Sequence, residues 1–303
     1  MRRIVLLFSF FIFGFILSAC TTDADDERLS VVATTTFIGD MVEQIAGDRI
    51  DLFVMMGPGI DPHDYLPTAR DTQRLQNADL IVINGLNLEE RMGQVLASLN
   101  DEAVLVLGDY LNETDLLFED DDDAFDPHMW FDLSLWSTLV PVVAERLSAL
   151  DPQNSSIYQA RATQYVLDLL DTHELFLSRV QAIEPDQRIL ITAHDAFAYL
   201  GRAYGFEVYA IQGISTEGQA SINDIRDLAA LMKEKQVTKV FFESTLPEET
   251  IQALVEAAQA IGHQASVGGV LFSDSTGSFG EGLDTLTRAM RHNMNTILSA
   301  LGD

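Results

Sequence analysis

The sequence is short of cysteine and of basic residues. Its 303 residues include one cysteine, Cys20, so no disulfide can form within the chain. Its 18 lysines and arginines, of which only three are lysines, stand against 47 acidic residues and give a formal net charge of −29. This charge argues against nucleic acid and anionic membrane surfaces as partners, and it favours cations. An acidic surface also suits a high-salt habitat, and that alternative stays open.

The N-terminus has the pattern of a targeting segment. Arg2 and Arg3 precede an apolar run over residues 4–17, which is too short for a comfortable membrane span and typical of a secretory signal. The run ends in Leu-Ser-Ala-Cys, which resembles a bacterial lipobox with Cys20 as the lipid-modified first residue. We expect residues 1–19 to be a signal peptide and residues 20–28 a lipidated tether. The protein would be exported and lipid-anchored to the outer face of the bacterial cytoplasmic membrane, or on its periplasmic side. A plain signal peptide with a chance cysteine is the alternative.

Residues 154–183 contain neither glycine nor proline and predict one unusually long helix. Their larger apolar residues recur at steps of three, four and seven, which places one stripe along a helix of about 45 Å. Pro152 stands just before this segment and Pro185 ends it. The segment is either a rigid strut between two lobes, which we favour, or a long surface helix of one large domain.

Strand and helix patterns alternate on both sides of this segment, which predicts parallel sheets. We expect an α/β fold of two lobes, each a parallel sheet flanked by helices, joined by one long rigid backbone helix. The bounds are 29–150 for the N-terminal lobe, 151–184 for the linking helix and 185–303 for the C-terminal lobe. Strands are expected at 31–35, 50–56, 80–83, 104–107, 188–192, 207–210, 239–243 and 264–267. Helices are expected at 37–46, 67–76, 88–99, 133–150, 196–204, 222–235, 247–260 and 282–301.

Four loops that follow predicted strands carry the candidate ligands. Ligands of open parallel sheets bind beyond the carboxyl ends of the strands. Two of these loops, both in the first lobe, contain Asp-Pro-His, ending at His63 and His128. The corresponding loops of the second lobe contain His194 and Asp274. Three imidazoles and one carboxylate would form a mixed nitrogen and oxygen set for a divalent transition metal, although single histidines in loops are usually only polar loop residues.

Seven motifs, spread over the mature chain, carry a resemblance to a known family. They are Asp61-Pro62-His63-Asp64-Tyr65-x-Pro67, Asn84-Gly85-x-x-Leu88-Glu89, Asp126-Pro127-His128-x-Trp130, His194-Asp195-Ala196-Phe197-x-Tyr199, Gly213-Ile214-Ser215-Thr216-Glu217, Phe242-Glu243-Ser244 and Phe272-x-Asp274. Together they resemble the solute-binding lipoproteins of zinc and manganese ABC transporters.

The resemblance implies a function, a ligand set and a partner. It implies a binding protein, not an enzyme, that captures one divalent ion, Zn²⁺ or Mn²⁺, between the lobes and delivers it to a membrane ABC permease. It also implies ligands at His63, His128, His194 and Asp274. We expect a monomer. Zinc-specific relatives often have a histidine-rich loop where this chain has the acidic run at 119–123, so the metal stays open. That run is either a solvated loop or a weak cation-gathering segment.

Other residues receive more modest interpretations. Glu243 ends a predicted strand and could accept a hydrogen bond from the ring N–H of a metal ligand, or form a buried ion pair. Trp130 is expected to pack beneath the site, while His173, His263 and His292 are expected to be structural or surface residues. Two other functions compete with transport. An exported zinc hydrolase would use three histidines and an open water position, and a surface adhesin lipoprotein would not need the four loop ligands.

Overall fold

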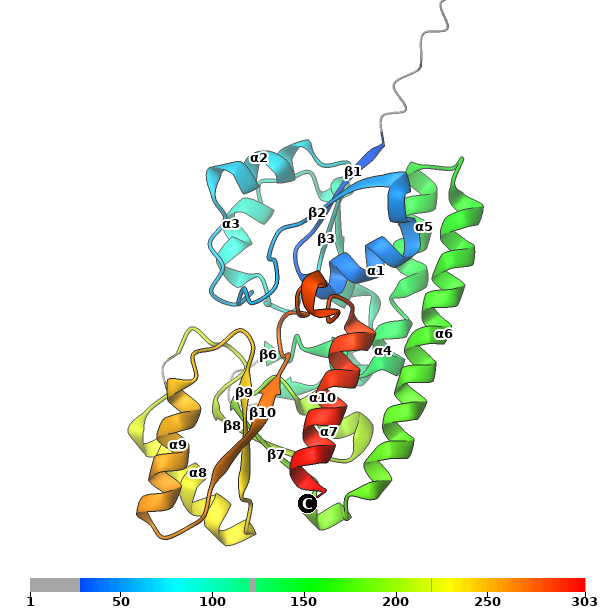
Figure 1. Ribbon diagram of the computed structural model, residues 1–303. Helices are drawn as coiled ribbons and strands as arrows, with labels where there is room; N and C mark the ends of the chain where they lie inside the picture. The colour runs from blue at the N-terminus through cyan, green and yellow to red at the C-terminus, as the bar shows by residue number, and fades with distance from the viewer. Residues whose placement is uncertain (1–27, 120–123, 219, 303) are drawn as a thin grey trace, which may run out of the picture.

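The structure is a computed structural model that describes residues 28–119, 124–218 and 220–302. The predicted signal peptide, the lipidation site Cys20 and residues 120–123 of the acidic run therefore lie outside the described residues. Two lobes stand one above the other along a shared flank of helices (Figure 1).

Four parallel strands form the sheet of the first lobe. Their order is β2-β1-β3-β4, and Val31 at its centre lies opposite both Leu52 and Leu80. Strand β3 has the sequence Leu-Ile-Val-Ile and is buried along its whole length, as expected for a parallel strand covered on both faces. The bounds are β1 (Leu29–Ala33), β2 (Ile50–Val54), β3 (Leu80–Ile83) and β4 (Val104–Val106).

The helices of this lobe differ from prediction at two places. The expected helix 88–99 is reduced to a 3-10 turn, Glu90–Met92, and the single turn α3 (Gly93–Leu96). The expected helix 133–150 is two helices, α4 (Leu133–Ser137) and α5 (Val140–Leu150), and Pro141 lies in the first turn of α5, where its missing N–H costs no hydrogen bond. By length and composition Leu133–Leu150 could cross a membrane, but both helices pack against α6. The remaining elements are α1 (Thr36–Ala46), α2 (Ala69–Asn77) and the short antiparallel pair β5 (Phe118–Glu119) and β6 (Ala124–Phe125).

The second lobe contains two parallel strand pairs, β7–β8 and β9–β10, with β7 beside β9. Strand β10 is interrupted between Val267 and Gly269, where Gly269 has a φ of 150°, a conformation that a side chain disfavours. The strand bounds are β7 (Ile189–His194), β8 (Glu207–Gln212), β9 (Lys239–Glu243) and β10 (Ser266–Leu271). The helices are α7 (Ala198–Tyr204), α8 (Ile222–Lys235), α9 (Glu249–Ala260) and α10 (Leu286–Leu301). Strand β10 corresponds to the predicted strand 264–267, but it begins and ends later.

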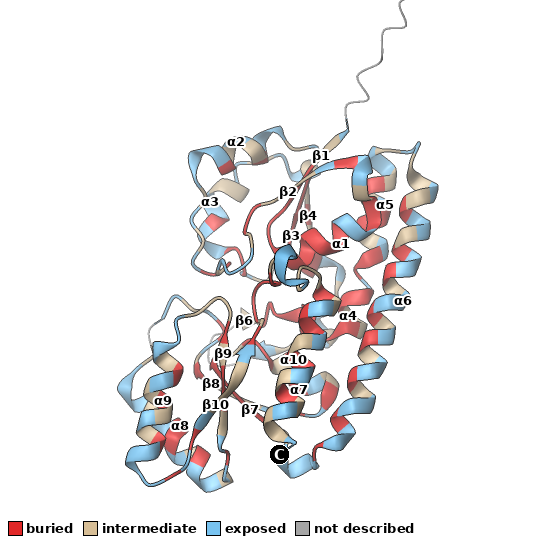
Figure 2. Cartoon of the chain, viewed as in Figure 1, coloured by how far each residue is buried: buried red, intermediate tan, exposed pale blue. Residues whose placement is uncertain are grey.

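The long helix is present as predicted. Helix α6 (Ser155–Arg179) has 25 residues, about 37 Å at 1.5 Å per residue, and a 3-10 turn, Val180–Ala182, continues it. It runs past both lobes (Figure 1), and its buried stripe alternates with exposed residues along its length (Figure 2). The stripe consists of Tyr158, Ala162, Tyr165, Leu169, Thr172 and Phe176. The fold class predicted from the sequence is confirmed.

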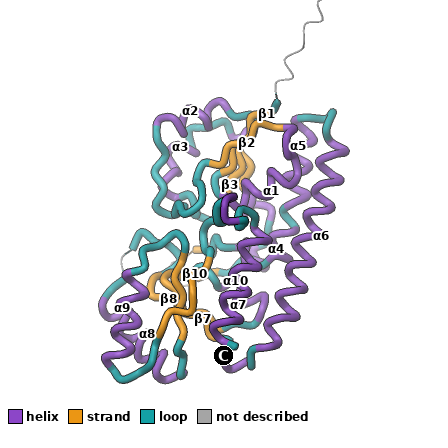
Figure 3. Tube along the Cα trace, viewed as in Figure 1, coloured by secondary structure: helices purple, strands orange, loops and turns teal. Residues whose placement is uncertain are grey.

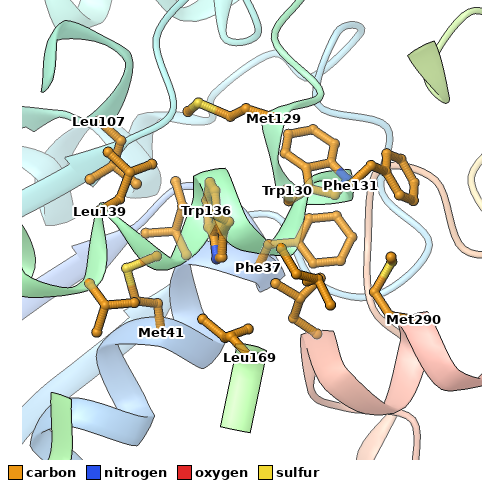
Figure 4. Packing of buried hydrophobic residues seen from close by; sticks show 14 of the residues in the cluster. Phe37, Met41, Leu107, Met129, Trp130, Phe131, Trp136, Leu139, Leu169 and Met290 are labelled. Carbon is orange, nitrogen blue, oxygen red and sulfur yellow. The ribbon is translucent and has the colours of Figure 1, made fainter. Parts of the chain in front are cut away.

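One continuous hydrophobic core extends from the first lobe into the second. It contains Phe37 and Met41 of α1, Trp136 of α4, Leu169 of α6 and Met290 of α10, all at most 1% exposed. These side chains converge on one another (Figure 4). Because each large side chain buried in this way contributes about 1.5–3 kcal/mol, opening the lobes through this core would be costly.

The connection between β10 and α10 is hydrogen-bonded to the first lobe. It rises from the second lobe to pass beside α1 (Figures 1 and 3). Three bonds join the two parts: Trp130 Nε1 donates to Ser273 O at 2.9 Å, Gly59 N to Ser275 Oγ at 2.9 Å, and Thr276 N to Thr36 Oγ1 at 2.8 Å.

A fourth attachment involves α10 itself. The buried carboxylate of Asp40, in α1, accepts hydrogen bonds from Leu286 N at 2.9 Å and from the Tyr165 hydroxyl at 2.8 Å. One side chain thereby ties α1, α6 and the first turn of α10 together.

Candidate metal centre

The structure brings the four sequence-predicted ligands together at the junction of the lobes. His63 and His128 lie in loops of the first lobe, His194 is the last residue of β7, and Asp274 lies three residues beyond β10. One ligand atom from each lies within 4.8 Å of every other. The exposed fractions are 4% for His63, 2% for Asp274 and 0% for the other two. Four polar groups are thus buried facing one another, an arrangement that needs a cation or protons to balance it.

The spacing of the ligand atoms fits a small divalent cation. His128 Nε2 lies 3.2 Å from His63 Nε2 and 3.3 Å from His194 Nε2. The Asp274 carboxylate presents Oδ1 to His128 Nε2 at 3.4 Å and Oδ2 to His194 Nε2 at 3.2 Å. Ligands about 2.0–2.1 Å from a tetrahedral zinc are separated by roughly 3.3–3.4 Å, so these distances suit such a site. Asp274 Oδ1 is buried and has no hydrogen-bond partner within the described part of the chain, which also suits a cation ligand.

The first residue of each Asp-Pro-His motif fixes the histidine that follows. Asp126 Oδ1 accepts the backbone N–H of His128 at 2.9 Å and lies 2.7 Å from its ring Nδ1. Asp61 Oδ1 accepts the backbone N–H of His63 in the same way, at 2.9 Å, but its Oδ2 accepts the hydroxyl of Thr216 in the second lobe at 2.6 Å. This contact of Asp126 was not predicted from the sequence, although the repeated Asp two residues before His was the available signal.

Glu243 lies against the third imidazole. Its Oε2 is 2.6 Å from His194 Nδ1, and its Oε1 accepts the backbone N–H groups of Ala193 and His194 at 2.8 and 2.9 Å. Glu243 ends β9 and His194 ends β7, so the neighbouring strands bring the two residues together. In both His128 and His194, a carboxylate lies at Nδ1 and leaves Nε2 directed at the common centre. This is the arrangement of metal-binding histidines.

Burial and charge shift the pKa values of these groups in different directions. Burial lowers the pKa of His63 to about 3. For His128, burial also disfavours the charged ring, but the carboxylates of Asp126 and Asp274 outweigh it and raise the pKa to about 9. For His194, burial is likewise outweighed by Glu243 and Asp274, and its pKa lies well above the usual 6.5. Burial would raise the pKa of Asp274, but the two imidazoliums hold it well below 3.8. Without a cation, these shifts favour the charged, imidazolium forms of His128 and His194.

A cavity of about 310 Å³ adjoins the site on the side of His63. Its walls include Leu86, Asn87 and Glu90 of the first lobe and Glu217 of the second. His63 is the only one of the four candidate ligands that lines this cavity, so it is the ligand nearest to solvent.

The remaining candidates occupy the places expected from the sequence. The indole of Trp130 stacks on Phe37 with a centroid distance of 4.9 Å and lies 5.3 Å from the His128 ring, beneath the site. Three other histidines bond elsewhere. His173 Nδ1 lies 3.1 Å from the Tyr204 hydroxyl, and ring Nε2 atoms contact backbone oxygens at 2.6 Å for His263 and 3.1 Å for His292.

Fold and site together define a class: two-lobed α/β binding proteins that hold a ligand at the junction of the lobes. Residues 31–300 match the family model described as zinc-uptake complex component A, periplasmic. The chain is 41% identical over 280 residues to the zinc-binding protein TroA of Treponema pallidum, covering 92% of this chain and 90% of that protein. It is 37% identical over 292 residues to the manganese-binding lipoprotein MntA of Bacillus subtilis, covering 95% of each.

Structural comparison gives the same family. The solved structure of the periplasmic zinc-binding protein TroA from Treponema pallidum superposes with a TM-score of 0.88 at 40% identity, covering 90% of this chain and 99% of that one. The chain belongs to the zinc-uptake complex component A family, and the resemblance inferred from its motifs is confirmed. The relatives named above are a zinc-binding and a manganese-binding protein.

Proposed function

We propose that this protein is the solute-binding component of an ABC transporter, which captures one Zn²⁺ or Mn²⁺ ion between its lobes and delivers it to a membrane permease. The observation that supports this most directly is the convergence of His63, His128, His194 and Asp274 at the lobe junction. In this role the carboxylates of Asp126 and Glu243 lie against Nδ1 of His128 and His194 and leave Nε2 of each ring directed at the ion. Family membership supports a metal as the cargo.

The proposal includes the anchor and the organisation of the chain. After removal of residues 1–19, Cys20 carries the lipid, and residues 20–28 tether a monomer to the outer face of the cytoplasmic membrane. Residues 29–150 form the first lobe, 151–184 the linking helix and 185–303 the second lobe. The name of the Bacillus subtilis relative, a lipoprotein, supports the anchor.

Binding without turnover is the test of this function. Purified protein incubated with Zn²⁺ and desalted should retain one equivalent, with no metal-dependent hydrolysis of ester, peptide or phosphoester substrates. A hydrolase needs a coordination position open to water, whereas Asp274 occupies the fourth position here. The neighbouring carboxylates of Asp126 and Glu243 already accept backbone N–H groups and contact ring nitrogens. Turnover without stoichiometric retention would overturn the proposal.

Zinc should bind more tightly than manganese. Three imidazole nitrogens suit zinc, and affinity rises from Mn²⁺ toward Zn²⁺ along the Irving–Williams order. Both Asp274 oxygens face the centre, so manganese can gain a further oxygen ligand and still bind. We expect a preference of at least about tenfold, roughly 1.4 kcal/mol. Competition calorimetry with the two ions measures it, and equal affinities would refute it.

Metal binding should change the overall shape little. The lobes share α6, a continuous core and the four attachments of segment 273–286, whereas large hinge motions need flexible connections. Small-angle scattering of metal-loaded and chelator-treated protein should give nearly equal radii of gyration. A large contraction on loading would show that the junction is a hinge.

A further inference from the structure

The motif Asn84-Gly85-x-x-Leu88-Glu89 supplies no candidate ligand, yet it buries two polar side chains. Asn84 is 1% exposed and Glu89 is 4% exposed. Glu89 Oε1 accepts the Thr34 hydroxyl at 2.7 Å and the Asn84 backbone N–H at 2.8 Å, and Oε2 accepts the Gly85 N–H at 3.1 Å. Thr34 follows β1 and Asn84 follows β3, so this carboxylate ties together the ends of two neighbouring strands.

The loop that Glu89 holds has an unusual backbone. Gly85, Leu86 and Asn87 are three successive residues with φ values of 77°, 53° and 65°. Residues other than glycine are disfavoured there, so the conformation needs support from its surroundings. Consecutive N–H groups that converge on one carboxylate provide such support. Leu86 and Asn87 also line the cavity beside His63, so the same carboxylate fixes one wall of the opening to the site.

Asn84 connects this loop to a candidate metal ligand. Its Nδ2 donates to the carbonyl oxygen of Pro127 at 3.0 Å. That oxygen and the N–H of His128 belong to the same peptide group, and Asp126 Oδ1 accepts the N–H at 2.9 Å. The peptide plane before His128 is therefore held from both sides, by Asn84 and the Met129 N–H at its oxygen and by Asp126 at its nitrogen. Because the peptide is planar, fixing its orientation also fixes the N–Cα bond of His128, from which φ sets the direction of the side chain.

We propose that Asn84 and Glu89 are positioning residues for His128: Glu89 fixes the loop, and Asn84 holds the Pro127 carbonyl so that His128 Nε2 points at the cation. This inference rests on the proposed function. Neither residue touches the ion. This role requires a hydrogen-bond donor at Asn84. It requires two acceptor oxygens at Glu89, because the Thr34 hydroxyl and the N–H groups of residues 84 and 85 all donate to that carboxylate.

The test compares Asn84→Ala and Glu89→Gln with two matched controls in the same lobe. Glutamine preserves the size of Glu89 but turns an N–H toward one of the donors. The controls are Asn77→Ala, on an exposed position at the end of α2, and Glu43→Gln, on an exposed position of α1 away from the cavity. Zinc affinity is measured by competition with a chromophoric chelator, and the visible spectrum of the Co²⁺-loaded protein reports the ligand geometry. Thermal unfolding in excess chelator reports stability separately.

We expect both variants to weaken zinc binding by about tenfold to a hundredfold, as is usual for partners that orient a ligand, and to alter the Co²⁺ spectrum. Both controls should keep the wild-type spectrum. A lower unfolding temperature with unchanged zinc affinity and an unchanged spectrum would reduce Asn84 and Glu89 to a structural role and overturn the inference. If Asn84→Ala folds poorly, Asn84→Asp replaces it, because aspartate keeps the size but places an acceptor against the Pro127 oxygen. Weaker zinc binding with an altered Co²⁺ spectrum would support the inference, and unchanged zinc affinity with an unchanged spectrum would overturn it.

His128→Ala separates this inference from the function on which it rests. If wild-type protein binds zinc tightly, His128→Ala loses it and the Asn84 and Glu89 variants do not, only the positioning role fails. If His128→Ala binds as wild type does, the ligand assignment itself fails.

Discussion

Replacing His128 by alanine should weaken zinc binding by about a thousandfold or more, roughly 4 kcal/mol. Its Nε2 lies 3.2–3.4 Å from a ligand atom of each of the other three residues, so it occupies the centre of the set. Alanine would remove one of four bonds to the ion and leave Asp126 buried without its imidazole partner. His63→Ala should also weaken binding by orders of magnitude, and the double variant should retain no tightly bound metal. Competition with a chromophoric chelator measures each loss.

Two controls make this expectation specific. His292→Ala removes an imidazole that contacts the Val270 carbonyl oxygen away from the site, so it should leave zinc affinity unchanged. Deletion of residues 119–123 removes the acidic run and should remove only weak, additional binding. Tight binding that survives the double variant, or disappears with the acidic run, would place the site elsewhere.

The second large effect is on pH. With the pKa of His128 at about 9 and that of His194 well above 6.5, we expect both rings to be in the charged, imidazolium form at neutral pH when no metal is bound. The cation must displace the extra proton of each charged ring, so affinity should fall with decreasing pH by about tenfold per pH unit for each ring that is charged, which includes His128 from below pH 9. The pKa of His63, about 3, keeps that ring neutral and without influence over the same range.

This pH dependence differs from that of unperturbed imidazoles. Rings with a pKa near 6.5 would give an affinity that is flat above about pH 7.5 and falls only below it. Here the fall should already be present between pH 8 and pH 7. Chelator competition at several pH values gives the slope, and calorimetry in buffers of different ionisation enthalpy counts the released protons. A slope of zero between pH 8 and 7, with no proton release, would contradict these protonation states.

The sequence predicts the secondary structure best where one local rule dominates. The strand 80–83 is apolar throughout, and the long helix lacks any breaker, so both appear as expected. Predictions fail where tertiary contacts decide. Residues 88–99 are apolar enough for a helix, but the preceding left-handed loop and its bonds to Glu89 leave only single turns.

The candidate ligands could be predicted from the sequence because each lies at or beyond the end of a strand and in a motif with its own signature. Their supporting contacts were harder to find. That Glu243 reaches His194 depends on β7 lying beside β9, which chain order alone does not determine. The contact between Asn84 and Pro127 joins residues that are 43 positions apart in the sequence. It depends on where the two loops meet in the fold.

The hydrogen bonds of segment 273–286 to the first lobe change which lobe holds each ligand in place. By chain order, each lobe contributes two ligands. By hydrogen bonding, Asp274 is flanked by Ser273 and Ser275, whose partners Trp130 and Gly59 belong to the first lobe. Thr245, which follows β9 of the second lobe, also donates to Asp274 Oδ2, at 3.4 Å. A relative movement of the lobes would therefore carry His194 away from His63 and His128 and pull Asp274 in both directions, so even a small displacement within a stiff frame would disturb the ligand set.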